Sequence, residues 1–257
     1  MAIEYSTAYR NLLQGFCGKK QALMNGVFEI FTGSAPASPD NAATGTKLVR
    51  LTISSGGWTP EVLSYGTVTL SGSEGQVDSI TVNGVSLLSA VVVYSTDLAT
   101  TAALVAANIN ANWTVPKYMA SSSGAVVTIT ALPGTGTGPN TWVVVCTVSG
   151  GTLGQVTANM ANGVAAINGL TFGGVSAGAL QKTGIWSGVV LATGIAGYWR
   201  QTGSRNDDGL ADTSPWTKVR MQGTCGTSGA DYNMSTTSLT SAATHTMDTW
   251  IETLSED

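Results

Sequence analysis

Two apolar runs flank a long polar loop near the start of the chain. The first run is Val27–Phe31 and the second is Leu48–Ile53, and in both of them apolar and polar residues tend to alternate. The loop between them contains Pro36 and Pro39, which lack the N–H donors that a further strand would need. Strand-like runs joined by a polar loop are typical of antiparallel partners. The pattern therefore predicts a strand pair at the edge of a β-domain.

Strand-like patterns return after Gly169 and continue to the end of the chain. Two early strands alone cannot bury a core, so they need these later strands as partners. We therefore expect a mainly β protein whose discontinuous antiparallel β-sandwich domain combines residues 26–60 with 168–257. The later strands are predicted at Leu170–Phe172, Ile185–Ala192, Gly197–Thr202, Trp216–Met221, Asn233–Ser238 and Met247–Leu254.

The middle of the chain, residues 61–167, has a different pattern and is predicted to be an inserted α+β domain. Asn83-Gly84 is typical of a type I′ hairpin turn. One helix is expected after a cap at Thr96 or Asp97, and it should end before Pro116. Its apolar stripe is Leu98, Ala102, Val105, Ile109 and Trp113. Strands are predicted at Tyr118–Ser121, Val126–Ala131 and Trp142–Val148.

The N-terminal arm, residues 1–25, is predicted to form one helix over residues 6–24, capped by Ser6 or Thr7. Gly15 and Gly18 each weaken such a helix by about 1 kcal/mol relative to alanine. A helix of this kind needs packing, either against its own β-domain or against a neighbouring subunit. The side chains predicted as possible assembly contacts are Tyr9, Leu12, Leu13 and Phe16.

Charged residues make up 10% of the chain, well below the usual ~25%. A chain that is solvated mainly by hydroxyl and amide groups suits an assembled or extracellular protein, in which neighbours cover much of the surface. The 11 Lys and Arg residues form no basic cluster, so no nucleic-acid partner is expected. No apolar run is long enough to span a membrane, and the N-terminus lacks a signal-peptide pattern. Cytoplasmic synthesis is expected because the three cysteines are interpreted as free thiols.

Candidate chemistry is sparse, and we expect no catalytic residue, no cofactor and no metal. The single histidine, His245, is interpreted as a surface or strand-end residue, because no nucleophile motif accompanies it. Asp207, Asp208 and Asp212 could hold Ca²⁺ on a loop, but their spacing does not match an EF-hand, and a solvated turn is favoured. The scattered Cys17, Cys146 and Cys225 are interpreted as buried free thiols.

Five aromatic residues in the C-terminal part have two interpretations. They can fill the core of the sandwich, which we favour, or they can line a platform for a sugar. They are Trp186, Tyr198, Trp199, Trp216 and Trp250.

Three segments together resemble a family of tailed-bacteriophage virion structural proteins. They are Ser6–Leu13, Phe28–Leu48, and Ala192–Arg200 with its continuation through Asp208-Gly209, Gly223–Asp231 and the closing strand. The resemblance covers nearly the whole chain and implies that the three segments belong to one small β-domain. Many members of the family lack the middle unit, and residues 65–165 are similar to modules of other phage structural proteins. The shared motifs are scaffold motifs and designate no active site.

The resemblance implies a non-enzymatic structural subunit located in the virion. We expect, in particular, a capsid decoration or cement protein whose β-domain and N-terminal helix dock on neighbouring subunits. Its expected partners are the major capsid protein or tail subunits and further copies of itself in a homo-oligomer, with no nucleic acid and no membrane. Alternatives are a tail or neck component, such as an adaptor, a tube-associated protein or a fibre-like protein, and a receptor- or glycan-binding module. An enzyme is the least supported alternative.

Overall fold

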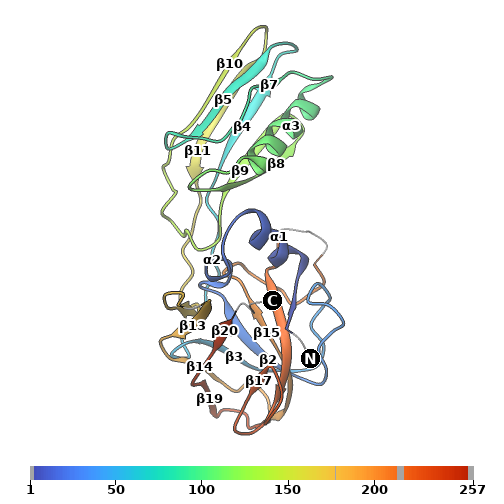
Figure 1. Ribbon diagram of the computed structural model, residues 1–257, viewed down its shortest axis with the longest axis vertical. Coiled ribbons are helices and arrows are strands. Elements are labelled where there is room, and N and C mark those ends of the chain that lie inside the picture. The colour runs from blue at the N-terminus through green and yellow to red at the C-terminus, as the bar shows by residue number, and fades with distance from the viewer. Residues whose placement is uncertain (1–2, 177, 213–216, 254–257) are drawn as a thin grey trace. The chain divides into compact units, whose positions relative to one another are not determined.

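The computed structural model describes residues 3–176, 178–212 and 217–253. Strands hold 42% of the residues and helices 11%, which confirms the mainly β class. The chain divides into two compact units (Figure 1). Unit 1 comprises residues 1–61 and 166–257, and unit 2 comprises residues 62–165.

Unit 1 is built on a large sheet that combines the early and late strands. The sheet order is β1 (Glu4–Tyr5), β16 (Arg220–Gly226), β15 (Gly194–Thr202), β2 (Val27–Thr32), β3 (Lys47–Ile53), β14 (Trp186–Val189) and β19 (Thr244–Met247). Two short strands extend it: β17 (Tyr232–Asn233) pairs with β16, and β18 (Ser238–Leu239) pairs with β15. The predicted antiparallel pairing of β2 with β3 is confirmed. Their predicted position at an edge is wrong, because β15 pairs with β2 and β14 pairs with β3.

A small second sheet of unit 1 contains β12 (Thr171–Phe172), β13 (Ala179–Thr183) and β20 (Ile251–Thr253). The single closing strand predicted at Met247–Leu254 is therefore wrong within the described residues, because β19 and β20 belong to different sheets. The physical reason is Trp250, which lies between the two strands and buries its ring among other aromatic side chains. This inward turn takes the chain out of the large sheet.

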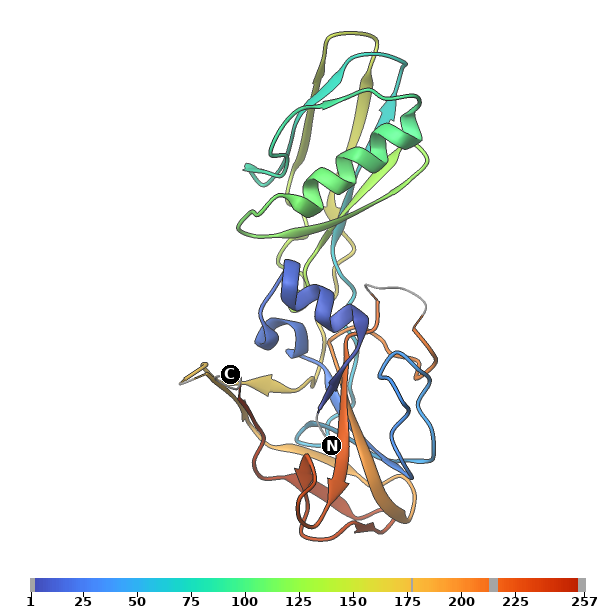
Figure 2. The same cartoon turned by 45° about the vertical axis from the view of Figure 1, so that its right-hand side comes forward.

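The N-terminal arm forms two short helices instead of the predicted single helix. The helices are α1 (Thr7–Gly15) and α2 (Lys19–Leu23), and Figure 2 shows them in dark blue beside the orange strands of the large sheet. Ser6 caps α1, since its hydroxyl accepts a hydrogen bond from the N–H of Tyr9 at 3.2 Å. The break falls at Cys17 and Gly18, where two weak helix formers coincide.

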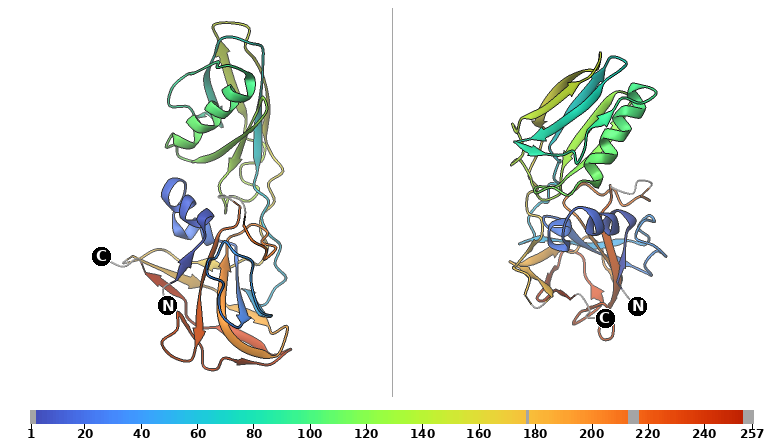
Figure 3. Two further views of the ribbon diagram at one scale, coloured as in Figure 1. Left: turned by 90° about the vertical axis from the view of Figure 1, so that its right-hand side faces the viewer. Right: turned by 45° about the horizontal axis from the view of Figure 1, so that its top comes forward.

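Unit 2 consists of two four-stranded sheets and one helix. The first sheet has the order β10 (Val144–Ser149), β5 (Gln76–Val82) and β6 (Val85–Ser86), with β7 (Val92–Val93) beside β5. The second has the order β11 (Gly154–Ala161), β4 (Tyr65–Ser71), β9 (Val126–Ala131) and β8 (Tyr118–Ser123). The helix α3 (Leu98–Ala111) packs chiefly against β8 and β9 (Figure 3). The strand β11 was not predicted from the sequence.

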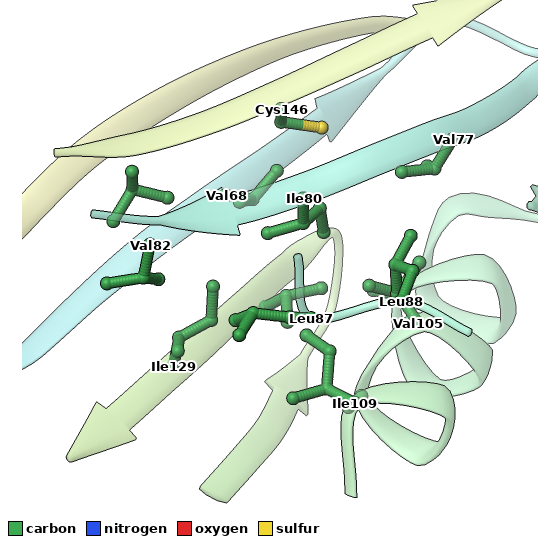
Figure 4. Close-up of a cluster of buried hydrophobic side chains, with 14 of the residues drawn as sticks. Val68, Val77, Ile80, Val82, Leu87, Leu88, Val105, Ile109, Ile129 and Cys146 are labelled. Atoms are coloured by element: carbon green, nitrogen blue, oxygen red, sulfur yellow. The ribbon is translucent and has the colours of Figure 1, made fainter. Parts of the chain in front are cut away.

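The core of unit 2 joins α3 to both sheets. Figure 4 shows Val105 and Ile109 of α3 directed toward Leu87 and Leu88 and toward the strand side chains. The predicted cap is confirmed, because the carboxylate of Asp97 accepts a hydrogen bond from the N–H of Thr100 at 2.6 Å. The predicted place of Trp113 on the apolar stripe is wrong. The helix ends at Ala111, so the indole is 69% exposed.

The chain enters and leaves unit 2 through paired segments. In unit 1, Thr59 and Ile167 form an antiparallel bridge with hydrogen bonds of 3.2 and 3.0 Å. In unit 2, Val62 and Val164 form an equivalent bridge with hydrogen bonds of 3.0 and 2.9 Å. The two ends of residues 62–165 therefore lie next to each other.

Candidate functional site

The residues predicted as assembly contacts lie mainly inside unit 1. Tyr9 and Leu12 are fully buried and Phe16 is nearly so, which corrects the expectation that their side chains are available to a partner. The ring of Tyr9 packs against that of Tyr5, with centroids 5.3 Å apart. A helix with a weak intrinsic propensity is stable only when its apolar side is buried, and here its own unit buries it. Leu13 alone of the four is half-buried, and its role in assembly stays a prediction.

Two buried arginines fasten the polar loop between β2 and β3. The guanidinium of Arg220 is fully buried and donates to the carbonyl oxygen of Pro39 at 3.1 Å. Arg200, which is also buried, donates to the carbonyl oxygen of Asn41 at 3.2 Å and to the side chain of Gln222 at 2.9 Å. Burial lowers the pKa of Arg200, and the neighbouring charge of Arg220 adds to that effect. In the described part of the chain no strand pairs with Pro39 or Asn41, and the two arginines supply the hydrogen bonds to these backbone carbonyl oxygens instead.

The same loop is also bonded to α1 and to β15. The carboxylate of Asp40 accepts hydrogen bonds from the N–H of Thr7 at 2.9 Å and from its hydroxyl at 2.7 Å. A carboxylate at this place stabilises the first turn of the helix. The hydroxyl of Tyr198 donates to the carbonyl oxygen of Thr44 at 2.7 Å, and it accepts from the N–H of Thr44 at 2.9 Å. The loop is therefore a fixed part of the surface.

The three aspartates of the loop after β15 bind protein cations and donors. Asp207 forms a two-point ion pair with Arg220, with both N···O distances at 2.5 Å. Asp208 pairs with Lys218 at 2.5 Å, and this contact holds its pKa below the usual range. The side chain of Asp212 accepts from the backbone N–H of Lys218 at 3.0 Å. The predicted solvated turn is thus an ion-paired turn, and the described residues contain no cluster of three or more His, Cys, Asp or Glu that could hold a metal.

Four of the five aromatic residues considered for a sugar platform are buried. Trp199 stacks on Phe28 with centroids 4.9 Å apart, and Trp250 meets Trp199 edge-on at 4.9 Å. The interpretation as core residues is confirmed for these four: Trp186, Tyr198, Trp199 and Trp250. The fifth, Trp216, lies outside the described residues.

His245 lies in β19 and is half-buried. Its Nε2 is 3.1 Å from the hydroxyl of Tyr232. Burial lowers the pKa of His245, and the nearby carboxylate of Asp248 opposes that shift. The two rings border a pocket of about 150 Å³, whose lining residues are Tyr232, Asn233, Met234, Ser235, His245, Thr246, Asp248 and Thr249.

The three cysteines are free, as predicted, but only Cys146 is buried, which corrects the prediction of burial for the half-buried Cys17 and Cys225. Burial raises the pKa of Cys17 and of Cys146 to about 11 and that of Cys225 to about 12. A thiol with such a pKa is protonated at neutral pH and is a poor nucleophile or metal ligand.

The surface of unit 2 is almost uncharged. Its four charged residues are Glu74, Asp78, Asp97 and Lys117. Lys117 is buried, and its ammonium group donates to the carbonyl oxygens at the end of α3, including that of Asn110 at 2.6 Å. The surface instead displays apolar side chains between hydroxyl groups: Tyr65, Val91, Val93, Leu104, Trp113, Val115, Val143, Val145 and Val156 are exposed.

Comparison of the chain with protein-family models, with curated proteins and with solved structures finds no match. No helix among the described residues has both the length and the apolar composition that a membrane crossing requires.

Sequence reasoning missed the two arginines that hold the loop. A signal for them exists, because Arg200 and Arg220 each stand in or beside an apolar run predicted to be a strand. A charge within a buried strand needs a partner. Asp207, the partner of Arg220, was predicted to lie in a solvated turn. This ion pair can be predicted only when β15 and β16 are known to be neighbouring strands.

Proposed function

We propose that the chain is a non-enzymatic structural subunit of a tailed-phage virion, and specifically a decoration or cement protein of the capsid. In this role it stabilises the particle through contacts with the major capsid protein and with further copies of itself. A tail or neck component is the alternative within the same class.

The observation that carries this proposal is the charge-poor surface of unit 2. In soluble domains ~25% of the residues are usually charged. Residues 62–165 include only four charged residues, and one of these four is buried. Exposed apolar side chains without intervening charges favour association. Such a surface suits a protein that neighbouring subunits cover in an assembly.

The arrangement of the three segments that resemble phage virion proteins gives further support. Their residues contact one another in unit 1: Thr7 of α1 donates to Asp40 of the loop, and Tyr198 and Arg200 of β15 hold the same loop. These contacts maintain a scaffold. They assemble no group of residues that could carry out a reaction.

The alternatives from other classes have less support in the described residues. A platform of tryptophans for a glycan requires exposed indoles, and the tryptophans considered for it are buried wherever they are described. A hydrolase would have to use His245, and the side chain bonded to its Nε2 is the phenol of Tyr232.

The test is the copy number of the chain in purified particles, measured by quantitative gel beside the solution mass from light scattering. Hundreds of copies, with a monomer or small oligomer in solution, are expected for capsid decoration. About six or twelve copies would support a closed ring of the tail or neck instead. Absence of the chain from the particles would refute the virion role altogether.

A further inference from the structure

The pocket beside His245 is lined mainly by polar side chains that take no part in the contacts that hold the polar loop or in the proposed function. It lies within unit 1, between β17 and β19, which Figure 1 shows near the same end of that unit. Its volume of about 150 Å³ is roughly ten times what a single ordered water requires. The pocket is therefore large enough for a small organic ligand.

The floor and the rim of this pocket differ in chemistry. Tyr232 and Met234 are buried and His245 is half-buried, so these three side chains form the floor. The remaining lining residues are exposed and form the rim: Asn233, Ser235, Thr246, Asp248 and Thr249. The rim thus provides hydroxyl, amide and carboxylate groups around a partly apolar base.

The charges of the lining exclude several ligand classes. Asp248 lines the pocket and no lysine or arginine does so in the described part of the chain, so an anion would meet a repulsive charge. A Ca²⁺ ion needs six to eight oxygen ligands, usually with several carboxylates, and the described lining has one carboxylate, that of Asp248. An apolar ligand would make no hydrogen bond to the five polar rim residues, so only the buried side chains of Tyr232 and Met234 would offer it favourable contacts.

A neutral ligand with several hydroxyl groups satisfies the same lining. Its hydroxyls can donate to the carboxylate of Asp248, and hydrogen bonds to a charged acceptor are about twice as strong as neutral ones. The side-chain oxygen of Asn233 already accepts from the N–H of Ala230 at 3.1 Å, so its amide nitrogen is the group that can donate to a ligand. Ser235 and Thr249 can donate or accept.

We propose that this pocket is a binding site for a single neutral sugar residue, with Asp248 accepting hydrogen bonds from ring hydroxyls and Asn233 donating to one. This site is independent of the proposed virion role. It also differs from the tryptophan platform, because its floor is Tyr232, Met234 and His245.

The single histidine of the chain makes a direct test possible. In the full-length protein with ¹⁵N-labelled histidine, the imidazole signals of His245 report on the pocket alone. D-glucose, D-galactose, D-mannose and N-acetyl-D-glucosamine are titrated separately at constant pH, beside inorganic phosphate and ammonium. At least one neutral sugar is expected to shift the His245 signals in a saturable way, whereas phosphate and ammonium should not.

Variants separate this site from unspecific effects. Asp248→Asn keeps the shape of an exposed side chain but removes the charge, and it should weaken binding of that sugar about tenfold or more. Ser235→Ala, also on the rim, should weaken it to a smaller extent. Glu74→Gln removes an equally exposed carboxylate in unit 2 and should leave binding unchanged.

Three results would overturn the proposal. The first is the absence of any saturable shift with all four sugars at tens of millimolar, and the second is a shift with phosphate or ammonium only. The third is equal sugar affinity in Asp248→Asn and in the unchanged protein.

Discussion

The buried ion pair of Arg220 with Asp207 gives the sharpest prediction about unit 1. The guanidinium has no exposed surface, makes two N···O contacts of 2.5 Å with Asp207 and donates to the backbone of the polar loop. Replacing Arg220 by alanine removes these contacts and leaves the carboxylate of Asp207 largely buried without its partner. Breaking a buried pair from one side costs about 3–5 kcal/mol.

This loss is large beside the total stability of a domain, which is about 5–15 kcal/mol. Urea unfolding followed by tryptophan fluorescence reports mainly on unit 1, because Trp186 and Trp199 are fully buried there. We expect Arg220→Ala to lower the free energy of unfolding of unit 1 by about 3–5 kcal/mol. The exposed Arg10 is a matched control, and its replacement by alanine should change stability by less than about 0.5 kcal/mol.

A double-mutant cycle separates the pair from the loop contacts. If the pair provides most of the stability, the combined Arg220→Ala and Asp207→Ala variant will be less destabilised than the sum of the two single changes. Arg220→Lys should recover only part of the loss, because an ammonium group cannot make the planar two-point contact. A loss below about 1 kcal/mol for Arg220→Ala would refute the assignment of Arg220 as the anchor of the loop.

Three further predictions concern other parts of the molecule. Asn110→Ala removes two hydrogen bonds of 2.8 Å to the backbone of Ala120 in the edge strand β8, and sedimentation velocity should reveal new self-association. Because burial lowers the pKa of His245, the free energy of unfolding should fall as pH drops below about 6.5, and His245→Gln should lose less of it over the same pH range; an equal loss in both proteins would contradict this. Joining Glu61 to Ala166 through a short Gly/Ser linker should leave a soluble β-domain with native near-ultraviolet circular dichroism, since the two ends of the excised segment are adjacent, and aggregation would count against it.

The sequence correctly predicted those elements that are determined by residues close together in the chain. The turn at Asn83-Gly84 has positive φ at both residues, as a type I′ hairpin requires. The cap at Asp97 and the strand Val126–Ala131 also follow from short-range chemistry. In each case the residue types that favour the element are next to one another in the chain.

The errors concern features that depend on distant residues. Whether β2 is an edge strand depends on β15, which lies more than 160 residues away in the sequence. The strand β11 (Gly154–Ala161) contains glycine, glutamine and asparagine, so its propensity is weak, and its pairing with β4 stabilises it. The candidate pocket was not predicted for the same reason. Its residues come from two short segments, 232–235 and 245–249, and only the fold brings Tyr232 to His245.

The charge-poor surface of unit 2 leaves few charges to protect its sheet edges. Soluble β-proteins commonly protect edge strands with charged side chains, and this unit has few of them. Amide side chains have that role here. Asn110 bonds the outer backbone groups of β8 at Ala120, and Gln155 of β11 donates to the carbonyl oxygen of Cys146 in β10 at 2.9 Å.

Where these amides cover the backbone at Ala120 and at Cys146, a further copy cannot pair with it, and such pairing is the route to open-ended β-aggregates. The exposed apolar and hydroxyl side chains of the sheet faces and of α3 remain available, and contacts between such faces depend on shape. Shape-dependent contacts fix one orientation between neighbours, as a closed symmetric assembly needs. The same reasoning explains why the expected effect of Asn110→Ala is association without unfolding. Opening one edge restores the backbone route while the core around Val105 and Ile109 stays intact.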